Sequence, residues 1–331
     1  MEHIINTLKD LQMENGLFVA APNQGTGYNK VWIRDTTYSS IGIESHDPQK
    51  AVGAMHGILD IFRKHEWKID HIISGHRPKY AYEYLHARYD PKTLGEFWEE
   101  WGNKQNDMIG AFLFRCAELM DRGYFVFRDH VDLRVIRKLV SYLEVIEYWH
   151  DPDNGMWEEA EELHASSIGA CLAGLKAMAK YINVPEHLIV NGKNALETLL
   201  PAESATKKVD LALLSLIYPY RIVRGKMAAK ILENIERKLV RKRGVIRYPG
   251  DQYYNNGKGE AEWTMGLPWL ALIYREMGNR RKYNEYMRKS KFAMCIKGFM
   301  PELWLAETDV HNTNSPLSWS QSLYIAAAVN A

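Results

Sequence analysis

The sequence predicts an all-α protein, an (α/α)6 toroid that forms a single domain over residues 1–331. Three observations lead to this prediction. Apolar residues recur at helical spacing along most of the chain, few segments alternate as strands do, and clusters of polar and aromatic residues precede an apolar helix six times. One sixth of the chain, about 55 residues, is close to the spacing of these clusters and suits two helices and their loops. The clusters are centred near Asp35, Gln105, Glu158, Asp210, Gly250 and Glu302.

Two kinds of helix alternate along the chain. Apolar helices follow the clusters and are expected to form an inner ring, over residues 36–43, 108–119, 166–179, 211–217, 268–274 and 317–329. Helices with a charged face, such as residues 227–243 and 280–291, are expected to form an outer ring. The best strand candidates, residues 123–127 and 245–248, are short. We see no linker that would divide the chain.

Composition indicates a small or neutral partner. The chain has 42 Lys and Arg against 41 Asp and Glu, a net charge of +1 that argues against a nucleic-acid or acidic-membrane surface. Residues 1–12 resemble an amphipathic helix rather than a signal peptide, and no apolar run approaches the ~18 residues that span a bilayer. Cys116, Cys171 and Cys295 lie in apolar runs, so we expect core thiols and a cytoplasmic location. The oligomeric state is not indicated.

The third cluster carries the clearest chemistry. It is a turn, residues 155–159, that ends in Trp157, Glu158 and Glu159. An indole offers an apolar face on which a sugar ring can stack, and low polarity raises a carboxyl pKa towards that of a general acid. The alternative is an ordinary helix start, where Glu interacts favourably with the helix dipole.

Polar and aromatic residues of the first cluster suit sugar recognition. Arg34 and Asp35 offer a donor fork and an acceptor to neighbouring hydroxyls, with Tyr28 and Trp32 as stacking planes. A structural Arg-Asp pair would give the same pattern.

Three further clusters are weaker on their own. The second contains Trp101, Gln105 and Asp107, which suit hydroxyl recognition or a capped loop. The fourth centres on Asp210, which is more typical of a helix N-cap. Arg247 and Asp251 belong to the fifth, a turn-rich segment expected to form a rim over a cleft or an exposed loop.

The sixth cluster carries Glu302, followed by Trp319 in the last apolar helix. Units three and six of a six-fold ring face each other, so Glu158 and Glu302 are expected to flank one glycosidic bond. Inverting hydrolysis needs such a pair, an acid and a base roughly 6.5 to 9.5 Å apart with a water between. A metal is not expected, because residues 150–162 fail as a calcium loop and the histidines lack His-Glu-x-x-His spacing.

The ordered set of motifs resembles the glucoamylase-type enzymes of glycoside hydrolase family 15, whose catalytic domain is an (α/α)6 barrel. The resemblance spans residues 28 to about 328. It implies that Glu158 is the general acid, that Glu302 is the general base, that Glu159 contacts the leaving sugar, and that no cofactor is needed. The residues that it implies for substrate binding are Tyr28, Trp32, Arg34, Asp35, Trp101, Gln105, Asp107, Trp157, Glu159, Arg247, Asp251 and Trp319.

The chain departs from the family pattern at positions that bear on the substrate more than on the reaction. Residues 103–104 are Asn-Lys where Arg-Pro is usual, Asn106 replaces an Arg, and residues 301–303 do not end in Gln. We see no starch-binding module, which favours short soluble oligosaccharides.

The leading hypothesis is an inverting, exo-acting α-glucoside hydrolase that releases β-glucose. A trehalase or an α-1,6-glucan hydrolase of the same family stays open. So does a catalytically silent carbohydrate-binding or regulatory domain, and the terpene-synthase alternative lacks an Asp-rich motif.

Overall fold

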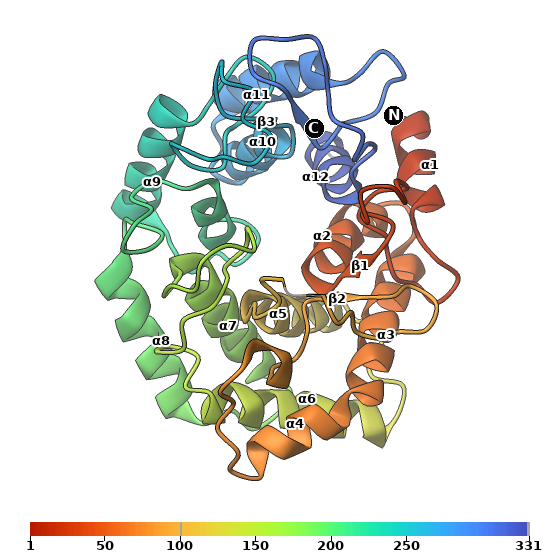
Figure 1. The fold of residues 1–331 in the computed structure, drawn as a ribbon, viewed down its shortest axis with the longest axis vertical. Coiled ribbons are helices and arrows are strands. Elements are labelled where there is room, and N and C mark those ends of the chain that lie inside the picture. Colours follow the sequence, from red (N-terminus) through yellow and green to blue (C-terminus); the bar gives the residue numbers. More distant parts are fainter. Residues whose placement is uncertain (100, 330–331) are drawn as a thin grey trace.

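Helices run in two concentric rings, as the computed structural model shows for residues 1–99 and 101–329 (Figure 1). The inner ring consists of α2 (Ile33–Glu44), α5 (Asp107–Asp121), α7 (Ala165–Met178), the 3-10 helix η2 (Leu211–Leu216), α10 (Gly266–Glu276) and α12 (Ser318–Ala328). The outer ring consists of α1 (Glu2–Asp10), α3 (Pro48–Lys64), α6 (His130–Val145), α8 (Glu186–Leu199), α9 (Gly225–Lys238) and α11 (Arg280–Ala293). The predicted all-α (α/α)6 toroid is confirmed.

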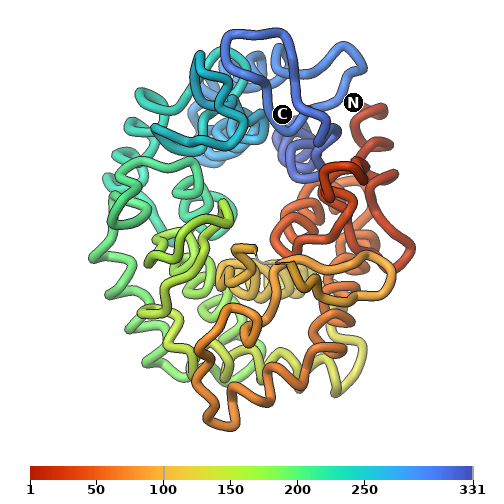
Figure 2. The backbone as a smooth tube through the Cα atoms, viewed as in Figure 1, coloured from red at the N-terminus to blue at the C-terminus, as the bar shows by residue number. Residues whose placement is uncertain are grey.

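The chain winds once around the toroid, so that its two ends meet (Figure 2). α12 packs against α2 and α1, which closes the ring. Two helical elements lie between α3 and α5 and belong to neither ring, α4 (Glu66–Ile73) and the short 3-10 helix η1 (Ala81–Glu83). Among the described residues, no helix is both long and apolar enough to cross a membrane.

Burial separates the two rings as the hydrophobic pattern predicts. In α7, twelve of the fourteen residues are buried, whereas α8 buries three of fourteen, Leu188, Gly192 and Leu196. A helix that is apolar all round must lie inside, and one with a single apolar stripe lies at the surface. The free cysteines Cys116 and Cys171 are buried in inner helices, and Cys295 is buried after α11.

Two small antiparallel ladders lie beside the inner helices. In one, β1 (Val31–Trp32) pairs with β2 (Arg88–Tyr89), directly before α2. In the other, β3 (Glu262–Trp263) pairs with β4 (Leu303–Trp304), directly before α10. Each ladder fixes the backbone next to a charged residue of a predicted cluster, Arg34 in the first case and Glu302 in the second.

The strand expected at residues 123–127 is wrong. After Gly123, which has a φ of 88°, residues 124–128 have no regular structure. Val126 is buried but Phe125 is 92% exposed, and the segment has no neighbouring strand among the described residues. The second candidate, residues 245–248, contributes only single bridges, from Val245 to Val240 and Trp263.

Inner helices approach each other to backbone distance at glycines. A Cβ on Gly110 of α5 would lie 2.3 Å from the backbone of Ala170 and Cys171 in α7, and one on Gly174 would lie 2.4 Å from the carbonyl oxygen of Gly110. Backbone cannot withdraw from such a clash as a flexible side chain can. The contact between α5 and α7 therefore requires glycine at both positions.

We predict that Gly110→Ala lowers the free energy of unfolding by about 1–3 kcal/mol, because the added methyl group overpacks the contact of two helices. Chemical denaturation measures the change. Gly53→Ala is the matched control, since Gly53 also lies in a helix but a Cβ there meets nothing within 4 Å. That variant should gain about 0.5–1 kcal/mol from helix propensity. A Gly110→Ala protein as stable as the parent would contradict this account of the packing.

Candidate active site

A cavity of about 370 Å³ opens where the loops before the inner helices meet. Its volume lies in the range of about 300–1,000 Å³ that is usual for small-molecule sites. Two predicted site residues, Gln105 and Asp107, do not line it. The predicted residues that line it are Tyr28, Trp32, Arg34, Asp35, Trp101, Trp157, Glu158, Glu159, Arg247, Asp251, Glu302 and Trp319.

The turn that carries Glu158 is held against the preceding loop. Asn154 donates its backbone N–H to the Lys104 carbonyl at 2.7 Å, and the Lys104 N–H donates to Oδ1 of Asn154 at 3.1 Å. A Cβ on Gly102 would lie 2.7 Å from the Glu158 carbonyl oxygen, so only glycine permits this approach. Glu158 has a φ of 65°, a left-handed conformation that costs about 1–3 kcal/mol. The packed loops thus fix the direction of this carboxyl.

Burial raises the pKa of the Glu158 carboxyl to about 7. Two contacts oppose this shift by favouring the ionised form: the Trp32 indole donates to Oε1 at 2.7 Å, and the Arg34 guanidinium lies 3.6 Å from the same oxygen. The side chain keeps 25% of its surface exposed, and the residue lines the cavity. A carboxyl that is half protonated near neutral pH can donate a proton to a bound ligand.

Arg34 is positioned by the second cluster. Its Nη1 donates to Gln105 at 2.8 Å and to Asp107 at 3.2 Å, and both acceptors are buried. Burial would lower the pKa of Arg34, but the surrounding carboxylates raise it, so the guanidinium stays charged. Gln105 and Asp107 therefore do not line the cavity themselves but hold the Arg34 side chain, which does. Burial raises the pKa of neighbouring Asp35 to about 6, against the opposite effect of Arg34.

Glu302 belongs to the loop before α12 and Glu158 to the loop before α7, and these two helices lie across the ring from each other (Figure 1). Glu302 immediately precedes β4 and is 1% exposed. The side-chain amides of Asn312 and Asn314 both donate to Oε2, the latter at 3.0 Å. Oε1 has no hydrogen-bond partner in the described part of the chain. The two amides thus anchor one carboxylate oxygen, while the other is buried without a hydrogen bond from them.

Burial also raises the pKa of Glu302 to about 7. The amides of Asn312 and Asn314 act in the other direction, since a hydrogen bond to a carboxylate favours its ionised form. Both carboxyls thus titrate near neutrality, Glu158 beside a cation and Glu302 beside neutral amides.

Aromatic rings form much of the remaining wall. The Tyr28 and Tyr253 hydroxyls are hydrogen-bonded at 2.8 Å, and burial raises the pKa of both. Trp263 lies with its ring centroid 5.7 Å from that of Tyr253 and 5.7 Å from that of Trp157. Rings at such distances and tilts attract each other and offer apolar faces to a ligand.

Glu159, next to the turn, is surrounded by donors. The Tyr248 hydroxyl donates to Oε1 at 2.5 Å, Arg247 donates to the same oxygen at 3.2 Å, and Lys207 pairs with Oε2. Arg247 also makes a two-point ion pair with Asp251, at 2.6 and 2.7 Å. A ligand that contacts Glu159 must share it with these groups.

Asp210 of the fourth cluster fixes the side chain of Trp157 by a hydrogen bond. Its indole N–H donates to Oδ1 of Asp210 at 2.8 Å, and that oxygen also accepts from the Ala212 backbone N–H at 2.7 Å. The predicted N-cap role of Asp210 is confirmed, and a second role is added to it.

A buried ion cluster lies beneath the same turn. Nδ1 of His164 is 3.4 Å from Glu203, and both residues are buried together with Asp153. Burial lowers the pKa of His164, but Glu203 and Asp153 outweigh that effect and raise it to about 9. A Cβ on Gly155 would lie 2.8 Å from the His164 ring, so the turn rests directly on this cation.

Several residues of the site were not predicted from the sequence. Asn312 and Asn314 hold Glu302, Tyr253 binds Tyr28, and Lys207 pairs with Glu159. The pattern Asn-x-Asn soon after a lone glutamate is a usable signal. The pairing of Lys207 with Glu159 joins two loops 48 positions apart and leaves no local trace.

Comparison with known proteins places the chain in a family. The model for Glycosyl hydrolases family 15 matches residues 1–242, more than half of the chain. The protein therefore belongs to this family. The match includes Glu158 and ends before Glu302.

Relatives and solved structures extend this comparison. A probable phosphorylase b kinase regulatory subunit alpha from Caenorhabditis elegans is 25% identical over 94% of this chain, and an uncharacterized glycosyl hydrolase from Methanocaldococcus jannaschii is 26% identical over 96%. The chain spans 31% and 54% of their respective lengths. A solved glycosidase structure superposes with a TM-score of 0.85 at 20% identity, covering 99% of this chain and 94% of that one. At this identity the likeness shows the fold.

We predict that two glutamate carboxyls of the cavity titrate near pH 7, because burial disfavours their charged forms. Carbon-13 NMR of protein labelled at the glutamate side-chain carboxyls measures the midpoints. Glu158→Gln should remove one such titration and Glu302→Gln the other. Midpoints near the unperturbed value of about 4.3 for both would contradict the description of the site.

Proposed function

We propose that this chain is an inverting, exo-acting α-glucoside hydrolase that releases β-glucose from the non-reducing end of short α-glucans. The observation that carries the proposal is the pair Glu158 and Glu302, two carboxyls of one cavity that come from opposite sides of the ring. Burial raises the pKa of both to about 7, so near neutral pH one can be protonated while the other is ionised. Membership of family 15 supports the reaction class.

In the proposed mechanism, Glu158 protonates the glycosidic oxygen while Glu302 takes a proton from the attacking water. The free Oε1 of Glu302 is the atom to which this water would bind, since Oε2 is held by Asn312 and Asn314. Water then attacks the anomeric carbon from the face opposite the leaving group, which inverts its configuration. As the bond between the anomeric carbon and the glycosidic oxygen breaks, that oxygen takes the proton of Glu158, and the proton from water goes to Glu302.

The terminal glucose would be held by the charged residues around the pair. Asp35 lines the cavity as an acceptor, and Arg34 and Arg247 line it as donors. Hydrogen bonds from charged groups are roughly twice as strong as neutral ones, and they orient the sugar relative to the two carboxyls. Trehalose or an α-1,6-linked glucan presents the same terminal ring, so these substrates remain alternatives within the proposal.

We predict that Glu158→Gln and Glu302→Gln each lower kcat by about 10² to 10⁴ in glucose release from maltose, isomaltose, maltotriose or trehalose. The controls are Glu161→Gln and Glu307→Gln, exposed carboxylates near each candidate in sequence that do not line the cavity. Both controls should keep the parent activity. Full activity in either candidate variant would overturn the role assigned to that residue.

A catalytically silent, carbohydrate-binding or regulatory domain is the second candidate. It is favoured by the likeness to a phosphorylase b kinase regulatory subunit alpha over 94% of this chain. Calorimetric titration with maltose and with a non-hydrolysable glucoside distinguishes an active hydrolase from a silent domain. Sugar binding with no turnover in the parent, unchanged in Glu158→Gln, supports the silent domain.

We predict a bell-shaped dependence of kcat/KM on pH, centred near pH 7. Activity falls below this range because Glu302 becomes protonated and above it because Glu158 loses its proton. Asn314→Ala removes a donor to the Glu302 carboxylate, so the pKa of Glu302 rises and the acid limb moves to higher pH while the alkaline limb stays.

The matched control for that shift is Thr26→Val. Thr26 donates its hydroxyl to the side-chain Oδ1 of Asn314 at 2.5 Å and has no hydrogen bond with Glu302 among the described residues. This variant should leave both limbs in place. If the alkaline limb of the pH profile moved in Asn314→Ala while the acid limb stayed in place, the roles assigned to the two glutamates would have to be exchanged.

A further inference from the structure

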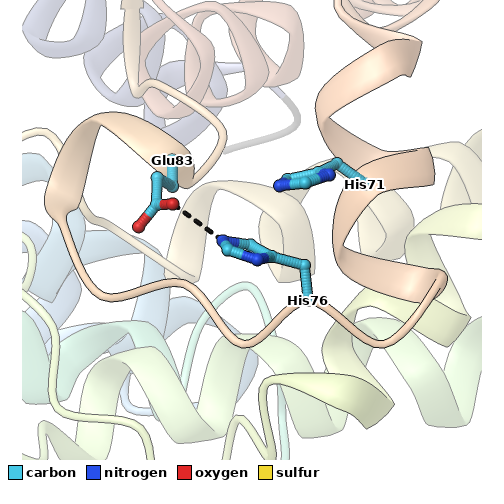
Figure 3. A group of neighbouring side chains, drawn as sticks. All are labelled: His71, His76 and Glu83. Carbon is cyan, nitrogen blue, oxygen red and sulfur yellow. Dashed lines mark hydrogen bonds and ion pairs between the residues drawn. The ribbon is translucent and has the colours of Figure 1, made fainter.

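Two histidines and a glutamate converge at a place away from the cavity (Figure 3). His71 comes from the last turn of α4, His76 from the loop that follows, and Glu83 from the end of η1. The two imidazole rings lie stacked, with centroids 4.0 Å apart, and nitrogen atoms of both face the side on which Glu83 lies. None of the three lines the cavity.

These side chains form a donor set for a transition metal. One ligand atom from each residue lies within 4.8 Å of the other two, and in the described part of the chain this is the one such group of three. Imidazole nitrogen and carboxylate oxygen together suit Zn²⁺, Co²⁺ or Ni²⁺, whereas Mg²⁺ and Ca²⁺ prefer oxygen alone. Bound Zn²⁺ lies about 2.0–2.2 Å from such atoms, so the 2.7 Å hydrogen bond between His76 and Glu83 must open around the ion while His71 moves closer to it. His71 is exposed and can change its rotamer to do so.

The carboxylate is already oriented by the backbone. Oε2 of Glu83 accepts from the N–H groups of Lys79 and Tyr80, at 2.6 and 2.8 Å. Oε1 lies 2.7 Å from Nε2 of His76. Hydrogen bonds that fix one oxygen of a ligand are the usual support for a metal site. The C-terminal end of α4, where His71 stands, also favours a cation through the helix dipole.

A His-Glu ion pair alone would explain part of this arrangement. It would not require the His71 side chain, which has no hydrogen bond or ion pair among the described residues and yet lies over the His76 ring. Arg77 and Lys79 belong to the same loop and repel a cation, but both are exposed, so their charges are screened by solvent. The two imidazoles and the carboxylate outweigh the screened charges of the loop, which favours binding of an ion with strong affinity for imidazole.

We propose that His71, His76 and Glu83 bind one Zn²⁺ or similar borderline transition-metal ion, with solvent water at the open position. The ion would fasten the loop after α4 to that helix. The inference is independent of the catalytic proposal, because the three residues do not line the cavity.

An ion that fixed this loop would also restrain the wall of the cavity, through two contacts. The Ala81 carbonyl, two residues before Glu83, accepts from the side chain of Asn103 at 2.9 Å. His86, at the end of the same segment, stacks on Trp101 with ring centroids 5.6 Å apart, and Trp101 lines the cavity. The proposed ion would therefore act structurally, on the segment that leads to a wall of the site.

Titration of the metal-free full chain tests the proposal directly. We expect calorimetry to give one Zn²⁺ per chain, and we expect Co²⁺ to give the visible absorption bands of a four-coordinate site. Mg²⁺ at the same concentration should give neither heat nor competition. Absence of Zn²⁺ binding would overturn the proposal, as would equal displacement by Mg²⁺.

Variants locate the ion. His71→Ala and His76→Ala should each weaken Zn²⁺ binding by about tenfold or more, and Glu83→Gln should do the same while its amide oxygen still accepts from the backbone. The matched control is His187→Ala, which removes another exposed histidine, 3.0 Å from Glu144, and should change nothing. Binding that is unaltered in the first two variants, or lost in the control, would place the ion elsewhere.

Thermal unfolding gives a second readout that needs no activity. Saturating Zn²⁺ should raise the Tm of the parent by on the order of 3 °C, because the ion binds the folded chain. Without metal, His71→Ala should unfold near the parent's temperature, since its side chain is exposed and leaves no cavity, and the same Zn²⁺ concentration should raise its Tm less. An equal rise in this variant would contradict the proposal.

Discussion

Closure of the inner ring is the constraint on which the site depends. α2 and α12 meet at Gly42, whose backbone N–H donates to the Ser322 hydroxyl at 2.8 Å, and a Cβ there would lie 2.5 Å from the Ser322 carbonyl. The Ser318 N–H also donates to the Ala20 carbonyl at 2.8 Å. Because the first and last inner helices touch in this way, the loops at both ends of the chain face one cavity. The six-fold order then places the third loop across from the sixth.

Burial and polar contacts act against each other on the two central carboxyls. Removal from water raises the pKa of Glu158 and of Glu302 to about 7, and nearby donors limit the rise. The donors differ in kind, a guanidinium and an indole for one residue and two amides for the other. Near neutral pH, one of the two carboxyls can thus be protonated while the other, across the cavity, is ionised. That state is the one that hydrolysis by an acid and a base needs.

Much of the fold and of the site followed from the sequence because the signals are local. Apolar helices are inner helices, and each cluster lies directly before the helix that places it, as Glu158 does before α7. The predictions that were wrong concern residues whose structure depends on partners far away in the sequence. Residues 123–127 are aromatic and apolar after Gly123 but have no strand to pair with in the part of the chain that the structure describes, and Gln105 holds Arg34 rather than lining the cavity. Contacts such as Lys207 with Glu159 arise only when the ring closes.

The anomeric form of the first product tests the central claim most directly. Proton NMR of the protein with maltose, followed from the first minutes, distinguishes the two anomers of released glucose before they interconvert. Attack of water assisted by Glu302, on the face opposite the proton donated by Glu158, predicts that β-glucose appears first and that the α form follows by mutarotation. Initial release of α-glucose would mean retention of configuration and would contradict the two-carboxyl inverting account.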